Sequence, residues 1–371
     1  MRLYISILFF IIVASLQASA DNELSYKVLK IADRVFYNTN KPVIKVLVSN
    51  KGMENCHGNV ICRIETDSNE HVYDFEQDFS VAQSDSAILS FKFGLDKGFY
   101  RVSVFANGKL EEQVNMAYEP ELVDSDCDKD FDPAVFYRKA RYELEKLPVY
   151  ALVEKVKKTG AKYRDVYKVK IRSLEGVYIE GYYAVPKKRG LYSVVLTCLD
   201  KNETLMMPDI DGYQDRIDFV ISPRKSFVHN ELYYVNSYMD LIRAIDFIYG
   251  RKEADLKNIS LQGTGEGGAM VLAVAALDKR VASLSVYAPG YSNENILDKS
   301  LAYDVKNLSG YIECPVVMGV GLEDKVIPPA ANFGIYNLIK SNKEYYIFIE
   351  GHYPPTQWKD IADNFYKKHK R

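Results

Sequence analysis

Three short segments in the last third of the chain carry residues whose types and order indicate chemistry. Residues 261–270 read LQGTGEGGAM, a glycine-rich turn between a strand-like and a helix-like run. A nucleophile elbow has this context, with the reactive side chain exposed on the sharp turn. Asp324 and His352 each follow a later apolar run, at 316–320 and 345–349. An elbow, an aspartate and a histidine in this order match the nucleophile-first chain order of a hydrolase triad.

The apex of that turn is Gly265, which supplies no nucleophile. A serine hydrolase forms its covalent acyl intermediate with a hydroxyl at this position, and loss of the triad serine costs about a millionfold in kcat in subtilisin. Thr264 lies one position before the apex, so its hydroxyl should point elsewhere. The N–H of Glu266 could still donate to an oxyanion, although its carboxylate would repel negative charge if it faced the site. Glycine also relieves the strain of roughly 1–3 kcal/mol that an elbow stores.

The same turn fits a second pattern. Gly263, Gly265 and Gly268 have the Gly-x-Gly-x-x-Gly spacing of a dinucleotide-phosphate loop. Such a loop normally follows the first strand of its fold, with an acidic residue about twenty positions later. Here several predicted strands come first, and residues 283–287 contain no acid. We therefore expect no dinucleotide and no other cofactor.

Charge and histidine spacing narrow the classes of ligand. The formal net charge is -2, and no basic stripe could neutralise phosphates, which argues against a nucleic-acid partner. The histidines other than His352 are scattered without the spacing of metal ligands: His57, His71, His229 and His369. We therefore expect no metal site.

Residues 134–371 show strands alternating with helices. Short, nearly continuous apolar runs are typical of strands buried on both faces of a parallel sheet. Such runs occur at 194–197, 219–221, 259–261, 284–287, 316–320 and 345–349. The segment 237–250 predicts a helix with Ser237 as N-cap and Gly250 as its end, and residues 269–277 predict the helix after the glycine-rich turn. We predict an α/β domain with a mostly parallel central sheet, and reactive groups beyond the carboxyl ends of its strands.

Residues 21–118 are predicted to form a small all-β domain. Short runs alternate apolar with polar side chains, the pattern of half-buried strands. Asn107-Gly108 predicts a tight hairpin, because both residues can take positive φ. Roughly seven strands in about a hundred residues suggest an immunoglobulin-like sandwich. The acidic segment 119–133, with prolines at both ends, predicts a linker to the α/β domain.

Residues 1–20 are predicted to be a signal peptide. Arg2 precedes the apolar run 3–16, and Ala18-Ser19-Ala20 has the small-x-small pattern of a cleavage site. A membrane anchor is the less favoured alternative, because the run is shorter than the roughly eighteen residues of a spanning helix. We expect an exported protein, periplasmic or secreted, with no integral membrane segment after the signal is removed.

Export raises the question of disulfides, and the chain has five cysteines. Cys56 and Cys62 flank a short segment and are the candidate pair for closing a loop. Cys198 and Cys314 lie in or beside apolar runs and are interpreted as buried, whereas Cys127 lies in the acidic segment.

Longer segments of the α/β region resemble a known family. YMDLIRAIDFI is similar to a Tyr-x-Asp-x-x-Arg-Ala segment, with Asp240, Arg243 and Ala244 in register. CPVVMGVGLEDKVIPPAANFGIYN is similar to the stretch that carries a triad aspartate, and Gly351-His352 follows as the triad histidine. The family with these segments is the acetyl xylan esterase and cephalosporin-C deacetylase family, and the resemblance runs from about Tyr167 to His352. It implies an α/β-hydrolase fold in which Asp324 and His352 occupy retained triad positions.

The chain also departs from the family pattern. GTGEGGAM replaces a Gly-Gly-Ser-Gln-Gly-Gly elbow, so Gly265 stands at the nucleophile position. Cys198-Leu199-Asp200 stands where the family has a His-Gly-Tyr loop that supplies an oxyanion donor, and Arg224-Lys225-Ser226 replaces Arg-Gly-Gln. The insertion that usually follows is shortened to FVHNELYYVNS. These departures converge on one site.

The resemblance and the departures together leave three functions open. We favour an exported esterase-like protein that is impaired as a serine esterase and retains its pocket for carbohydrate binding. The first alternative is an active deacetylase that acts on an acetylated carbohydrate or small ester with a replacement nucleophile or with water activated by His352 and Asp324. The second alternative is a structural or assembly protein. We interpret the Asp324–His352 pair as a relic that ties two loops together.

Overall fold

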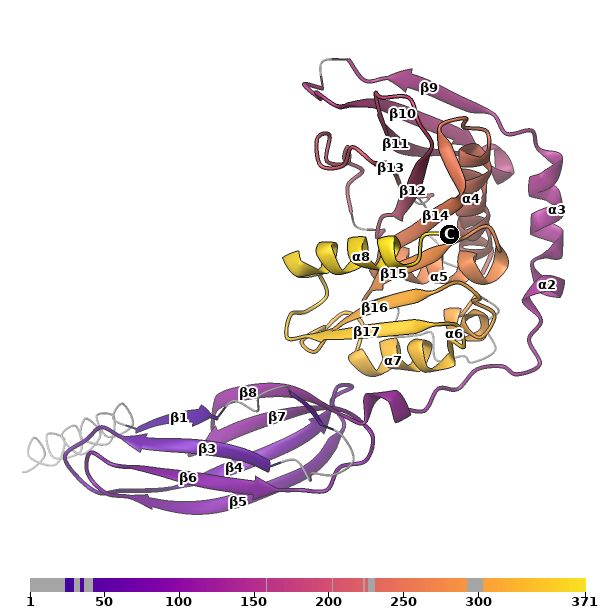
Figure 1. Ribbon diagram of the computed structural model, residues 1–371. Helices are drawn as coiled ribbons and strands as arrows, with labels where there is room; N and C mark the ends of the chain where they lie inside the picture. The colour runs from indigo at the N-terminus through magenta and orange to yellow at the C-terminus, as the bar shows by residue number, and fades with distance from the viewer. Residues whose placement is uncertain are drawn as a thin grey trace, which may run out of the picture. The chain divides into compact units, whose positions relative to one another are not determined.

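The computed structural model describes residues 24–29, 34–36, 43–157, 159–201, 203–222, 224–225, 231–291 and 303–371. The chain divides into two compact units, Met1–Val123 and Asp124–Arg371 (Figure 1). The predicted signal peptide at 1–20 lies outside the described residues, as do Ser226 and His229. The predicted linker 119–133 spans the division, and within it the Asp128 N–H donates to Asn307 Oδ1 of the second unit at 2.7 Å.

The first unit consists of two sheets that share one hydrophobic core. The three-stranded sheet has the order β1-β3-β6 and the five-stranded sheet has the order β2-β8-β7-β4-β5, with antiparallel pairing except between β2 and β8. Val46 and Leu89 of the first sheet pack in the same core as Val60 and Val104 of the second. The strands are β1 Leu24–Val28, β2 Val35–Phe36, β3 Val43–Asn50, β4 Cys56–Thr66, β5 His71–Val81, β6 Ser86–Lys92, β7 Gly98–Ala106 and β8 Lys109–Tyr118.

The predicted hairpin is confirmed. Asn107 and Gly108 join β7 to β8 with φ values of 49° and 78°. Both values are positive, as a two-residue turn that matches the twist of its strands requires.

The predicted disulfide between Cys56 and Cys62 is wrong. Both cysteines are free and both lie in β4. Six residues along an extended strand span roughly 20 Å, whereas bridged cysteines need Cα atoms within about 7 Å of each other. Cys62 instead packs in the core of the β unit, where burial raises the pKa of its thiol to about 12.

The second unit is built on a nine-stranded sheet of the described residues, with the order β17-β16-β15-β14-β12-β13-β11-β10-β9. The six strands from β17 to β13 pair in parallel, and β11, β10 and β9 continue the sheet in antiparallel fashion. Each of the six predicted apolar runs contributes to one of the parallel strands, so the prediction of a mostly parallel sheet is confirmed. The strands are β9 Ala151–Lys155, β10 Arg164–Arg172, β11 Tyr178–Pro186, β12 Tyr192–Cys198, β13 Arg216–Ile221, β14 Ala254–Thr264, β15 Ser283–Tyr287, β16 Val316–Gly321 and β17 Lys343–Phe348.

Helices cover both faces of this sheet (Figure 1). α4 and α5 pack together against one face, and α8 packs against β15 and β16 on the other. No described helix pairs the length needed to cross a membrane with a sufficiently apolar sequence. The helices are η1 Pro120–Leu122, α2 Pro133–Phe136, α3 Arg138–Lys146, η2 Leu174–Gly176, α4 Glu231–Tyr249, α5 Gly265–Leu277, α6 Val305–Ser309, α7 Pro329–Leu338 and α8 Thr356–Lys368.

The two predicted helices begin earlier than expected. α4 starts at Glu231, and Ser237 lies inside it, where its Oγ donates to the Tyr233 carbonyl oxygen at 2.8 Å. At an N-cap a serine oxygen accepts from a backbone N–H, whereas inside a helix the hydroxyl donates to the carbonyl four residues earlier. Serine is compatible with both positions, so the residue type did not determine where the helix begins. α5 starts at Gly265 rather than at residue 269, because the glycine-rich turn itself is the first turn of the helix.

Candidate functional site

The elbow is a sharp connection between β14 and α5. β14 ends at Thr264, and Gly265 opens α5 with φ of 56°. Glycine adopts this left-handed conformation without steric cost, whereas a side chain would be strained there. The Thr264 side chain makes no capping hydrogen bond to α5.

Asp324 and His352 lie in the turns that follow the two neighbouring strands β16 and β17. His352 Nδ1 and Asp324 Oδ2 are 3.0 Å apart, and the Asp324 side chain is 1% exposed. The other carboxylate oxygen of Asp324 accepts hydrogen bonds from the N–H groups of Val326 and Ile327 at 2.8 and 2.9 Å. These three contacts fix the carboxylate, and the carboxylate in turn orients the imidazole ring.

The imidazole ring faces the apex of the elbow. A Cβ atom built on Gly265 would lie 3.0 Å from His352 Nε2 and 3.2 Å from Cε1. The structure therefore brings together Gly265, Asp324 and His352, which lie up to 87 positions apart in the chain. The order of the strands explains this, because β14, β15, β16 and β17 are consecutive neighbours and end at the same edge.

A carboxylate occupies the space beside Gly265. Asp200 follows β12, the strand on the other side of β14, and its Oδ2 accepts a hydrogen bond from the Glu266 N–H at 2.9 Å. The Cβ atom built on Gly265 would lie only 2.3 Å from this same oxygen. The Asp200 N–H donates to Glu203 Oε2 at 2.8 Å, which fixes the start of the loop.

The side chain of Glu266 is buried rather than exposed in an open site. Its side chain is 2% exposed, and Oε2 lies 3.0 Å from Lys201 Nζ. Burial raises the pKa values of Tyr233 and Tyr234, and the negative charge of Glu266 raises them further. Glu266 therefore presents its backbone N–H to Asp200 while its carboxylate pairs with the loop lysine.

The electrostatic surroundings of His352 favour the imidazolium form. The hydrogen bond from Asp324 raises the pKa of His352 above its ordinary value of 6.5, burial opposes this, and the charges of Asp324, Asp200 and Glu203 add to the rise. A general base must be unprotonated to accept a proton. The neighbouring carboxylates thus make the neutral imidazole a stronger base, while they lower the fraction of it that is unprotonated at a given pH.

Arg224, the first residue of the altered Arg-Gly-Gln motif, pairs with a residue of the Tyr-x-Asp segment. Its Nε and Nη2 atoms lie 2.7 and 2.8 Å from the two carboxylate oxygens of Asp240 in α4, and the pair is buried. Arg224 Nη1 also lies 3.1 Å from Glu175 Oε2 in η2. A bidentate pair fixes geometry as well as charge, so these motif residues hold α4 to the sheet.

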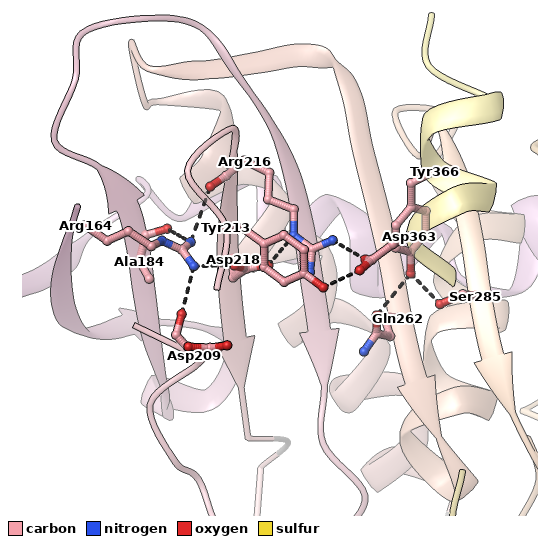
Figure 2. A network of polar contacts seen from close by, with 10 residues as sticks. All are labelled: Arg164, Ala184, Asp209, Tyr213, Arg216, Asp218, Gln262, Ser285, Asp363 and Tyr366. Carbon is pink, nitrogen blue, oxygen red and sulfur yellow. Dashed lines mark hydrogen bonds and ion pairs between the residues drawn. The ribbon is translucent and has the colours of Figure 1, made fainter. Parts of the chain in front are cut away.

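A second polar network holds the loop that carries Asp200. Figure 2 shows it between the β12–β13 connection, the sheet and α8. Arg164 Nη1 lies 2.6 Å from Asp218 Oδ2 and donates to the Asp209 carbonyl oxygen at 3.0 Å. Tyr213 donates to Asp363 of α8. The residues drawn are Arg164, Ala184, Asp209, Tyr213, Arg216, Asp218, Gln262, Ser285, Asp363 and Tyr366.

In the sequence, Asp200 stands out only as a departure from the family loop. The parallel pairing of β12 with β14, in which Cys198 lies opposite Gly263, places the loop beside the elbow. Which way the Asp200 side chain turns has no signal in the sequence. Among the described residues, no cluster of three or more acidic, histidine or cysteine side chains could hold a metal ion.

Comparisons with known proteins agree on one family. The family model described as acetyl xylan esterase matches residues 224–294 and 284–368. The chain is 28% identical over 301 residues to acetyl esterase Axe7A of Xylanibacter ruminicola. The aligned region covers 67% of this chain and 69% of the relative.

Solved structures show the same fold. Acetyl xylan esterase from Paenibacillus sp. R4 superposes with a TM-score of 0.60 at 20% identity, covering 68% of this chain and 98% of that one. Acetyl xylan esterase 1 from Thermoanaerobacterium sp. JW/SL YS485 superposes with a TM-score of 0.58 at 18% identity and the same coverage. The predicted α/β-hydrolase fold is confirmed.

Proposed function

We propose that the protein is an exported member of the acetyl xylan esterase family of α/β-hydrolases, that it has lost serine-dependent ester hydrolysis and that it binds carbohydrate. The observation that carries the proposal is the elbow itself. Gly265 offers no hydroxyl, and the one oxyanion donor recognised at the site, the Glu266 N–H, is bonded to Asp200. A nucleophile and free oxyanion donors are both required for acyl transfer.

Carbohydrate binding is supported by the family and by the polar character of the site. The relatives are acetyl esterases, two of them acetyl xylan esterases by name. The carboxylate of Asp200 and the imidazole of His352 are groups that bond to sugar hydroxyls. The leader-like residues 1–20 support export, and we interpret the β unit as an immunoglobulin-like module that accompanies the binding unit.

The second candidate is a deacetylase that uses water activated by His352 and Asp324. The intact 3.0 Å hydrogen bond between these residues favours it. The Glu266 N–H opposes it, because this oxyanion donor is already bonded to Asp200 at 2.9 Å and does not stabilise the charge that water attack would develop. We therefore place serine-free hydrolysis second.

The test combines hydrolysis with binding. Acetate release from acetylated xylan is measured for the mature chain and for His352→Ala, and xylo-oligosaccharide binding is measured by isothermal titration calorimetry. The proposal predicts no acetate release above buffer and a saturable binding isotherm. Acetate release that disappears in His352→Ala establishes the second candidate. Absence of both release and binding rejects the proposal and leaves a structural role.

A further inference from the structure

The Asp200 carboxylate lies where an acyl oxygen binds in a working esterase. In acyl transfer, the N–H of the residue after the nucleophile donates to the oxyanion. That residue is Glu266 here, and its N–H donates instead to Asp200 Oδ2 at 2.9 Å. A side-chain carboxylate of the protein therefore makes the hydrogen bond that a bound acetyl group would make.

Asp200 also lies in the space of the missing nucleophile. A Cβ atom on Gly265 would be 2.3 Å from Asp200 Oδ2, which is closer than non-bonded atoms approach. A side chain at position 265 and the carboxylate of Asp200 thus exclude each other. Glycine at position 265 is therefore compatible with this position of the Asp200 carboxylate, whereas serine is not.

We propose that Asp200 is a specificity-determining residue that fills the oxyanion position with the protein's own carboxylate, excludes acyl oxygens and admits ligands that donate hydrogen bonds, such as the hydroxyls of a deacetylated sugar. The sugar part of this inference rests on the proposed carbohydrate function; the occupied oxyanion position does not.

The chemistry of the groups gives the reason for this selectivity. An ionised carboxylate only accepts hydrogen bonds, as do an ester carbonyl and an acetate ion. Two acceptors compete for one N–H and repel each other, whereas a hydroxyl can donate to the carboxylate. The loop is fixed around this arrangement by the Glu203 bond to the Asp200 N–H and by the Lys201 pair with Glu266.

The first arm of the test follows the Glu266 amide by NMR during titration with sodium acetate. In the wild type its resonance stays in place, because Asp200 holds the N–H. In Asp200→Ala the resonance shifts with acetate. If Asp200→Ala does not fold, Asp200→Ser replaces it in the test, because the serine hydroxyl is too short to replace the carboxylate, and the same shift is expected. An acetate-dependent shift in the wild type, or no shift in the folded variants, overturns the proposal.

The second arm restores the nucleophile. Gly265→Ser alone stays near the buffer rate with p-nitrophenyl acetate, because Asp200 blocks the serine and the donor. The double variant Gly265→Ser with Asp200→Ala hydrolyses the ester about a hundredfold or more faster than the single variant, which is the rate effect of one oxyanion donor. The matched control, Gly265→Ser with Asp215→Ala, removes an exposed carboxylate of the same β12–β13 connection and stays low. A single Gly265→Ser variant as active as the double variant contradicts the proposal.

A third arm separates the two claims. Deacetylated and acetylated xylotriose are titrated into the wild type and Asp200→Ala. A preference for the deacetylated sugar that is lost in Asp200→Ala supports the whole inference. No binding of either sugar rejects the proposed carbohydrate function, while the acetate and rescue arms still decide the role of Asp200.

Discussion

At the scale of single residues, the site is defined by a steric exclusion. A Cβ atom at position 265 and Oδ2 of Asp200 cannot occupy their places at the same time. The backbone at Gly265 has φ of 56°, so an added side chain is strained by conformation as well as by contact. The conformational strain comes from the backbone at position 265, whereas the steric contact depends on the side chain of Asp200. The two can therefore be separated by paired substitutions.

We predict that Gly265→Ala lowers the free energy of unfolding by about 1–3 kcal/mol, the range for a strained non-glycine residue. The added contact with Asp200 increases the loss. Asp200→Ala should recover part of it, so the two substitutions are non-additive. Urea unfolding of the wild type, both single variants and the double variant measures the coupling. Strict additivity would show that the two positions do not share space.

His352 provides a prediction for pH. Its folded-state pKa should exceed the ordinary value of 6.5, chiefly through the Asp324 hydrogen bond. A group with a raised pKa stabilises the fold fully below its unfolded pKa, and this contribution is lost as the pH rises through the folded pKa. Imidazole NMR titration measures the folded value, and Asp324→Asn should lower it. An unchanged titration in Asp324→Asn would remove the assigned cause.

At the scale of elements, the family-like motif around α4 has a structural role in this chain. Arg224 and Asp240 form a buried bidentate pair between the segment after β13 and α4. Breaking a buried pair by removing one partner leaves an uncompensated charge, which is strongly destabilising.

We therefore predict that Arg224→Ala lowers the free energy of unfolding by about 3–5 kcal/mol. Arg224→Lys should recover only part of this, because an ammonium cannot form the two parallel hydrogen bonds. Lys225→Ala, at the exposed neighbouring position, is the control and should leave stability within about 0.5 kcal/mol. Thermal and urea unfolding of the three variants measures these differences. A free energy of unfolding for Arg224→Ala equal to that of Lys225→Ala would contradict the structural role of Arg224.

Element boundaries were less predictable than element types. The six parallel strands could be predicted, because strands buried on both faces leave uninterrupted apolar runs. The start of α4 could not, because Ser237 serves equally well as a cap or inside a helix. The prediction of a Cys56–Cys62 disulfide was wrong for a similar reason, since spacing alone does not distinguish a loop from a single extended strand.

At the scale of the whole molecule, the fold brings to one edge residues from four separate strand ends. Gly265, Asp324 and His352 could be found from the sequence, because chain order and the parallel sheet predict their meeting. Asp200 could not be assigned a role, because its contact depends on the direction of one side chain in a non-helical loop. The Arg164 and Asp363 network that holds this loop also joins residues about two hundred positions apart in the chain (Figure 2).

Steady-state hydrolysis of p-nitrophenyl acetate by the wild-type chain decides whether the esterase fold persists here without its chemistry. We expect a rate equal to that of buffer and unchanged in His352→Ala. A wild-type rate well above buffer that His352→Ala abolishes would show instead that Asp324 and His352 still catalyse ester hydrolysis without a serine.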